Sequence, residues 1–405
     1  MTSKGTINKN LITNSLNQII GVGFPILIQY YIIRHLRLDD IGYWAIINSA
    51  KSFVLLSISF LNIYLIKVLA EDSVNEKTSS YLTNTITVMY VIITIPFLGF
   101  LGYMFFSYRF LFQYVLISSI PLLTTPLGMD FYFQAKFKND YLFYRRLVVR
   151  ILFIVSLFVF VKNKSDFIYY VWISSLALTL EHMINFYMLR KFVIVKTIEK
   201  RRLLEIFKGS IGYLPFNLSY NSLPNIAIMT GAYFLEMKTL AVITILMKII
   251  NLATTFISST VMVLFPLKVK NINTKVKESF NDLRYLRNTV LFSLAAIIGL
   301  VIFRKLIFII FLHKYEIANL DTEFIVLSFY ILIHSIYNYL VFNFYLIKNK
   351  SFFISKLNFF IILIFFIEII FSKQFHFHIL FALEVIIPPS ILLVYLIKRI
   401  FLKTL

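Results

Sequence analysis

Long apolar runs broken by short polar stretches dominate the pattern of hydrophobic and polar positions along this chain. A helix needs about 20 mostly apolar residues to cross a bilayer. Transmembrane β-strands would instead show segments of about 10 residues in which apolar and polar positions alternate. We therefore predict twelve transmembrane helices, at roughly 10–33, 43–66, 82–106, 110–133, 147–161, 167–189, 209–232, 239–265, 289–311, 324–347, 352–372 and 378–397.

The composition supports this interpretation. Of the 405 residues, 59% are hydrophobic and 15% are charged, whereas soluble domains have about 45–50% apolar and about 25% charged residues. The formal net charge of +21 would suggest a nucleic-acid partner in a soluble protein. In a membrane protein, Lys and Arg in the loops explain it, so we expect no nucleic-acid partner. The sequence predicts an all-α polytopic membrane protein.

The distribution of basic residues predicts how the chain is oriented. With the N-terminus inside, the cytoplasmic segments hold about 28 of the 40 Lys and Arg residues, and the outer loops hold about 10. This bias is the positive-inside pattern. The first apolar run is long and lacks a small-residue cleavage site, which favours a first span over a signal peptide. We expect a multi-pass protein of the inner (plasma) membrane with both termini in the cytoplasm.

Several kinds of chemistry are not supported by the sequence. The absence of Cys excludes disulfides, thiolate metal sites and Cys nucleophiles. We find no phosphate-binding Gly-rich loop and no His/Asp cluster at metal-ligand spacing. The stretches between spans reach at most about 23 residues, which leaves little room for a catalytic domain. We therefore expect no enzyme activity, no metal and no cofactor.

The chain divides into two similar halves. The basic segment Arg190–Lys208 separates six predicted spans from six more, which gives lobes at residues 1–200 and 201–405. Lys51 lies in the second span of the first half, and Lys248 lies in the second span of the other half. Transporters are often built from two such repeats, with the substrate site between them. We predict about twelve helices in two six-helix lobes around a central cavity.

Amide side chains recur at helical spacing on four predicted spans, namely the first, the seventh and the two that carry Lys51 and Lys248. A Lys within a span costs about 2.5–3.5 kcal/mol on insertion scales, so it faces a cavity or a partner. One interpretation is a polar cavity for an anionic group; the alternative is an ion pair with Asp130, Glu181, Glu368 or Glu384. The candidate substrate-binding residues are Asn14, Gln18, Asn48, Lys51, Asn217, Asn221, Lys248 and Asn251.

Three residues are candidates for ion coupling. Glu181 and Glu384 are the acids predicted to lie deep in spans. Burial disfavours the charged form of a carboxyl, which would suit proton exchange; the alternative is a hydrogen bond to a neighbouring helix. His334, with Asn338 one turn further on, is the third candidate. The arginines at 145–150, by contrast, are expected to extend to the membrane interface.

One segment carries a recognisable motif. An acid, three aromatic residues and a Gln are followed by a basic loop and an Arg-led fifth span: Asp130, Phe131, Tyr132, Phe133 and Gln134. This segment resembles the end of the fourth span in the O-antigen flippase family. That family belongs to the multidrug/oligosaccharidyl-lipid/polysaccharide exporter superfamily. Ala135 replaces the usual Gly, and the family's Trp is absent from the segment. The stretch from Asn14 to Trp44 is also similar to the family's opening.

The resemblance implies a function. Members of this family flip undecaprenyl-diphosphate-linked oligosaccharide repeat units from the cytoplasmic to the outer leaflet by alternating access. The units serve synthesis of O-antigen, hence lipopolysaccharide, or of another surface polysaccharide. The implied partners are the lipid-linked oligosaccharide, membrane lipids, a polysaccharide polymerase and a chain-length regulator. Lys51 and Lys248 lie where the related lipid II flippases carry cavity cations.

Two other functions stay open at this stage. A drug/cation antiporter of the same superfamily shares the expected architecture, but it would favour acids in the cavity. A polysaccharide polymerase acts on the same lipid-linked units and also has many spans. It normally has a long outer loop rich in Arg, which this chain lacks.

Overall fold

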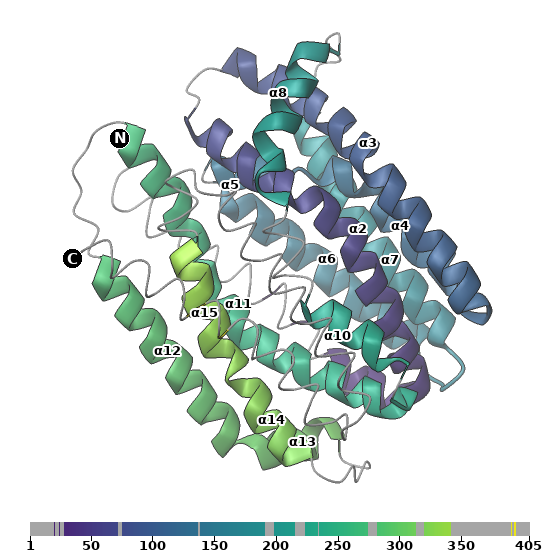
Figure 1. Ribbon diagram of the computed structural model, residues 1–405. Coiled ribbons are helices and arrows are strands. Elements are labelled where there is room, and N and C mark those ends of the chain that lie inside the picture. Colours follow the sequence, from purple (N-terminus) through teal and green to yellow (C-terminus); the bar gives the residue numbers. More distant parts are fainter. Residues whose placement is uncertain are drawn as a thin grey trace.

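A computed structural model describes most of the chain as packed helices (Figure 1). The described residues are 28–71, 75–136, 138–190, 198–214, 223–233, 235–273, 282–312 and 320–341, with single positions at 20, 24, 390 and 393. Within these ranges no strand occurs, so the all-α prediction is confirmed. The helices are α2 (Leu38–Glu71), α3 (Asn75–Ser107), α4 (Phe112–Gly128), α5 (Asp130–Ala135), α6 (Asn139–Phe160), α7 (Phe167–Leu189), α8 (Lys200–Ile211), α10 (Leu223–Gly231), α11 (Met237–Asn273), α12 (Asp282–Ile302), α13 (Arg304–Leu312), α14 (Leu320–Ser328) and α15 (Tyr330–Leu340), with a 3₁₀ turn at Arg109–Leu111.

Seven helices in the described part are long and apolar enough to cross a membrane. They correspond to the predicted spans two, three, four, six, eight, nine and ten. Helix α6 fills the place of the fifth span but begins at Asn139 and carries three arginines, which makes it too polar to count among the seven. The eleventh and twelfth predicted spans and most of the first lie outside the described residues, and the seventh is described only in part.

The helices form two lobes. In the first, α4 and α6 pack against α7, and α2 packs against α3; in the second, α15 packs against α11 and α12. Figure 1 shows α2–α7 (purple to blue) on one side and α11–α15 (green) on the other, and the lobes meet along α2 and α11. Helix α8, just after the predicted boundary at residue 200, packs on α2 and α3. The division at 200 stays a prediction.

Large apolar side chains cover the outward faces of both lobes. In α3, Ile95 and Phe106 are 79% and 86% exposed, and in α12, Ile298 is 57% exposed. Contiguous apolar surface of this kind is rare on soluble monomers. Because lipid has no hydrogen-bonding groups, such faces suit the bilayer, and the polar side chains are left for the interior of the helix bundle.

The two lobes approach each other closely at one end of the molecule, where α2 and α11 begin; we call it the contact end. A Cβ atom on Gly42 would meet the carbonyl oxygen of Met237, so only glycine permits this approach. The hydroxyl of Tyr103, in α3, lies 3.0 Å from the hydroxyl of Tyr233, which follows α10. The contact end is therefore held by one close backbone approach and one hydrogen bond.

Gly42→Val is expected to separate the lobes at the contact end. Overpacking typically costs about 1–3 kcal/mol, and 1.4 kcal/mol is a tenfold change in population. Because the chain has no Cys, cysteines introduced at Tyr103 and Tyr233 can be joined by a flexible thiol-reactive cross-linker. The cross-linked fraction should fall about tenfold. Gly99→Val is the matched control, since a Cβ on Gly99 meets nothing within 4 Å; equal losses in both variants would contradict this role of Gly42.

Candidate functional site

A small cavity lies between the two lobes, a short distance along α2 and α11 from the contact end. It has a volume of about 160 Å³, and we call it the interlobe cavity. Helix α2 contributes one wall, and α10 and α11 contribute the other. The lining residues are Ile41, Trp44, Ala45, Asn48, Ser49, Pro224, Asn225, Ile228, Thr244, Met247, Lys248 and Asn251.

The interlobe cavity brings together three of the residues predicted to bind substrate: Asn48, Lys248 and Asn251. Asn48 donates its amide N–H to the carbonyl of Trp44 at 2.9 Å, and Thr244 donates to the carbonyl of Leu240 at 2.8 Å. These bonds satisfy the donors within their own helices and leave the Asn48 amide oxygen turned away from that bond. The polar faces predicted on α2 and α11 thus meet across the lobe boundary.

Lys248 is held across the lobe boundary by Gln29. Its Nζ donates to Oε1 of Gln29 at 2.8 Å, and the Gln29 residue is only 3% exposed. A neutral amide oxygen lowers the cost of burying an ammonium but leaves its charge in place. Among the described residues, the positive charge on the wall of the interlobe cavity therefore has no carboxylate partner.

Lys51 occupies the equivalent place in the other lobe. It lies 13 residues after Leu38, the start of α2, and Lys248 lies 11 residues after Met237, the start of α11. Lys51 is 6% exposed, and its Nζ lies 4.8 Å from the ring centroid of Trp44, which lines the interlobe cavity. A Trp face attracts a cation without neutralising it. Each half thus places one lysine close to the shared boundary, Lys51 buried and Lys248 partly buried.

The predicted ion pairs between these lysines and the acids at 130 and 181 are not formed. Among the described residues, no carboxylate lies within 4.0 Å of either lysine ammonium. Glu368 and Glu384 lie outside the described residues, as do the predicted substrate-binding residues Asn14, Gln18, Asn217 and Asn221.

Asp130 and Glu181 instead bind arginines inside the first lobe. Arg145 donates to both oxygens of Asp130, at 2.8 and 3.4 Å, and to Oε2 of Glu181 at 3.3 Å. Arg146 lies 3.7 Å from Asp130 and 3.8 Å from Glu181, and Arg150 lies 3.6 Å from Glu181. We call these five residues the arginine cluster. The expectation that the arginines extend to the membrane interface is wrong, because carboxylates on α5 and α7 hold them within the lobe.

The backbone around the motif places Asp130 in this cluster. Met129, between α4 and α5, has φ 45°, a left-handed conformation that costs a non-glycine residue about 1–2 kcal/mol. The turn it makes lets Asn185 donate both to Asp130 Oδ1, at 2.6 Å, and to the carbonyl of Gly128. Phe131, Tyr132 and Phe133 are buried, and α5 packs against α2. In this structure, the family motif joins the helices of one lobe.

Two ion-coupling candidates can be placed. Glu181, on α7, contacts the three arginines of the arginine cluster and is not among the residues that line the interlobe cavity. His334, on α15, lies 2.8 Å through Nε2 from Nδ2 of Asn338, as its spacing predicts, and packs against the Tyr330 ring. Neither arrangement tests ion coupling, which stays a prediction for these two residues and for Glu384.

Sequence reasoning missed Gln29 and Trp44, whereas Asn225 belongs to the polar face predicted on the seventh span. A signal for Gln29 was present, since it lies four residues after Pro25 and so continues the polar face of the first span. Trp44 likewise lies one turn before Asn48, on the face directed at the cavity. In the sequence, Trp44 was considered only as the end of the opening stretch that resembles the flippase family.

Comparison with known proteins yields likeness of structure but not of sequence. No protein-family model and no curated protein matches the chain. A structure of MATE in complex with MaD5 matches it with a TM-score of 0.70 at 14% identity, covering 100% of both chains. An outward-facing multidrug resistance MATE transporter of the MOP superfamily matches with 0.66 at 12%, covering 100% of this chain and 98% of that one. The lipid II flippase MurJ, in an inward closed conformation, matches with 0.67 at 14%, covering 96% and 86%. The chain therefore has the two-lobed fold that MATE transporters share with MurJ.

Proposed function

We propose that this protein is a flippase that moves an undecaprenyl-diphosphate-linked oligosaccharide repeat unit from the cytoplasmic to the outer leaflet. One observation carries the proposal. Each lobe carries a lysine at a matching position beside the lobe boundary, Lys51 buried and Lys248 partly buried, and in the described part neither lysine has a carboxylate within 4.0 Å. Two cations without carboxylate partners in the described part, beside the lobe boundary of a transporter fold, favour an anionic substrate.

The chemistry of a diphosphate fits this environment. Its negative charge cannot enter hydrocarbon without compensation, and lysine ammonium groups in a low-dielectric setting supply it. At about 160 Å³, the interlobe cavity has room for a small headgroup, while binding sites for larger ligands measure about 300–1,000 Å³. Passage of the sugars therefore requires the lobes to separate, and the polyprenyl tail can stay in the lipid.

Alternating access follows from the predicted topology. With both termini in the cytoplasm, α2 and α11 begin on the outer side, so the contact end faces outward. The structure then represents a state that is closed to the outside. Solved structures of the same fold are described as outward-facing and as inward closed, which supports movement of one lobe against the other.

A drug/cation antiporter is the second candidate, because MATE transporters recur among the similar structures. Such a protein needs acidic side chains that reach its substrate. In the described part, the acids Asp130 and Glu181 are paired with three arginines, and the interlobe cavity is lined by a lysine instead. These charges favour the flippase.

Deleting the gene tests the two candidates against each other. A flippase predicts loss of surface polysaccharide and accumulation of lipid-linked repeat units that an added periplasmic glycosidase cannot reach. Expression of the chain from a plasmid should restore both. Efflux of a cationic dye, measured in the same strains, should stay unchanged. Normal surface polysaccharide combined with loss of dye efflux would establish the antiporter instead. The polymerase, the chain-length regulator and an O-antigen product belong to this same proposal.

A further inference from the structure

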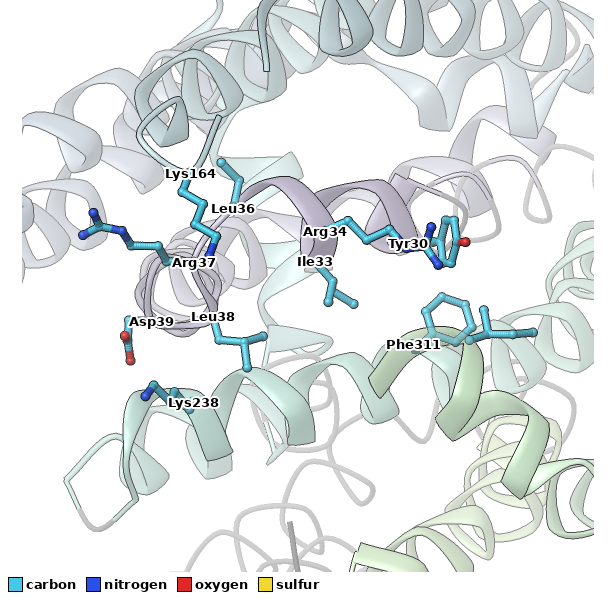
Figure 2. Close-up of a pocket in the computed structure, with 11 residues that line it drawn as sticks. Tyr30, Ile33, Arg34, Leu36, Arg37, Leu38, Asp39, Lys164, Lys238 and Phe311 are labelled. Atoms are coloured by element: carbon cyan, nitrogen blue, oxygen red, sulfur yellow. The ribbon is translucent and has the colours of Figure 1, made fainter. Parts of the chain in front are cut away.

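A second and larger cavity opens at the contact end. Its volume is about 640 Å³, and both lobes line it; we call it the contact-end cavity (Figure 2). Arg34 and Arg37 come from the segment just before α2, Lys164 comes from the connection between α6 and α7, and Lys238 is the second residue of α11. Three segments far apart in the sequence thus bring four cations to one space.

The contact-end cavity contains far more positive than negative charge. Among its lining residues, Asp39 is the one acid against four cations. Figure 2 shows Asp39 and Lys238 on the same side of the cavity, with Arg34 extending toward the Tyr30 ring. The Arg34 guanidinium lies 4.1 Å from that ring's centroid, so aromatic stacking holds its position.

Elsewhere in the described part, two less exposed arginines contact carboxylates. Arg202 lies 2.9 Å from Glu205, and Arg304 lies 3.4 Å from Asp321. Within the described ranges no carboxylate comes within 4.0 Å of the charged side-chain groups of Arg34, Arg37, Lys164 or Lys238, and Asp40 attracts the Arg37 charge only from further away. Four like charges around one cavity repel each other, and a bound anion of two or more charges would relieve that repulsion.

We propose that the contact-end cavity is a second anion site, which receives the diphosphate of the polyprenyl-linked saccharide on the outer side of the membrane. This inference rests on the proposed function and on the predicted topology, which turns the contact end outward. Arg34 and Arg37 offer forked donors that match phosphate oxygens, and the two lysines add point charges. The space is four times that of the interlobe cavity, so a sugar fits beside the diphosphate.

The exposure of these cations suits a site for release. All four are solvent-accessible in the described structure, and exposed ion pairs are individually weak, at about 0–1 kcal/mol. Binding here is therefore expected to be weaker than between Lys51 and Lys248 and to weaken with salt. An apolar wall that includes Phe311 completes the cavity and offers a face for a sugar ring or for the first isoprene unit.

The test uses the full-length chain in lipid nanodiscs and a short-chain polyprenyl diphosphate as the probe. The variant Lys164→Glu/Lys238→Glu should raise the dissociation constant of the probe at least tenfold. The matched control Lys162→Glu/Lys305→Glu makes the same charge change at exposed positions that do not line the cavity, and it should shift binding less than twofold. Inorganic pyrophosphate should compete with the probe in the wild-type chain and lose that effect in the Lys164/Lys238 variant. Thermal unfolding should be equal in both variants.

Unchanged binding in Lys164→Glu/Lys238→Glu, or equal losses in the control, would overturn the proposal. The proposal would also be overturned if Lys164→Glu/Lys238→Glu still binds the probe but no longer retains phosphatidylglycerol from mixed nanodiscs. That result would assign the cavity to a bilayer lipid. The proposed function has its own test: it is wrong if Lys51→Ala/Lys248→Ala still exports polysaccharide. Probe binding at the contact end is measured in that same variant, so the two failures are distinguishable.

Discussion

Arg145→Ala is expected to remove most of the folded protein from the membrane. Arg145 donates hydrogen bonds to both Asp130 and Glu181, and the side chains of Arg145 and Glu181 are 5% and 8% exposed. Removing one partner from a buried ion pair typically destabilises a protein by about 3–5 kcal/mol. Without Arg145, the two acids keep only the longer contacts of 3.6–3.8 Å to Arg146 and Arg150. We expect the protein level in membranes and the thermal midpoint in detergent both to fall strongly.

Two comparisons isolate this effect. Arg202→Ala removes an ion pair of similar length from the exposed surface of α8, where the loss is about 0–1 kcal/mol. Adding Asp130→Asn and Glu181→Gln to Arg145→Ala should not restore the protein level, because Arg146 and Arg150 would then lose their carboxylate partners. If Arg145→Ala is no less stable than Arg202→Ala, the arginine cluster does not hold the lobe together.

Lys51→Ala/Lys248→Ala is expected to abolish export of polysaccharide while the protein is inserted normally. Losing a cation from a span relieves an insertion cost of about 2.5–3.5 kcal/mol per lysine, so the double variant should not be less abundant. A diphosphate without its counter-charges, however, faces the full cost of desolvation in the membrane. Surface polysaccharide and membrane protein level, measured in the same cells, check this prediction.

Three further results decide what the lysines do. Arg at both positions should largely restore export, because it keeps the charge and bonds phosphate oxygens in a fork. Gln29→Leu removes the hydrogen bond from Lys248 but keeps the charge, so export should persist. If Gln29→Leu abolishes export as completely as Lys248→Ala does, the hydrogen bond between the lobes is what matters. Full export in the double alanine variant would refute a phosphate role for both lysines.

Much of the candidate site could be predicted because spacing along a helix determines which side chains share a face. Asn48, Lys248 and Asn251 were predicted to line a cavity from their positions on two spans, and the structure brings them together. Their matched depth follows from the similarity of the two halves. Gln29 was missed only because the polar face of the first span was not followed past Pro25.

The arginine cluster could not be predicted in this way. Arg145, Arg146 and Arg150 share a face of α6, but a helical face does not reveal whether lipid headgroups or carboxylates lie opposite. That depends on how α5 and α7 pack beside α6. The left-handed residue Met129 directs Asp130 toward the arginines, and no sequence pattern marked that turn.

The sequence by itself determined the fold class of this protein. Helical spans follow from the length of the apolar runs, because a backbone in hydrocarbon must satisfy its hydrogen bonds within one helix. Which charges are compensated and which are left over was decided only by the tertiary structure. Ion pairs act over a few ångströms between residues from different helices, so helix packing determines which of them form. In one lobe, three arginines lie beside two acids. In the described part of the chain, the charged groups of the two lysines at the lobe boundary and of the four cations at the contact end have no carboxylate within 4.0 Å.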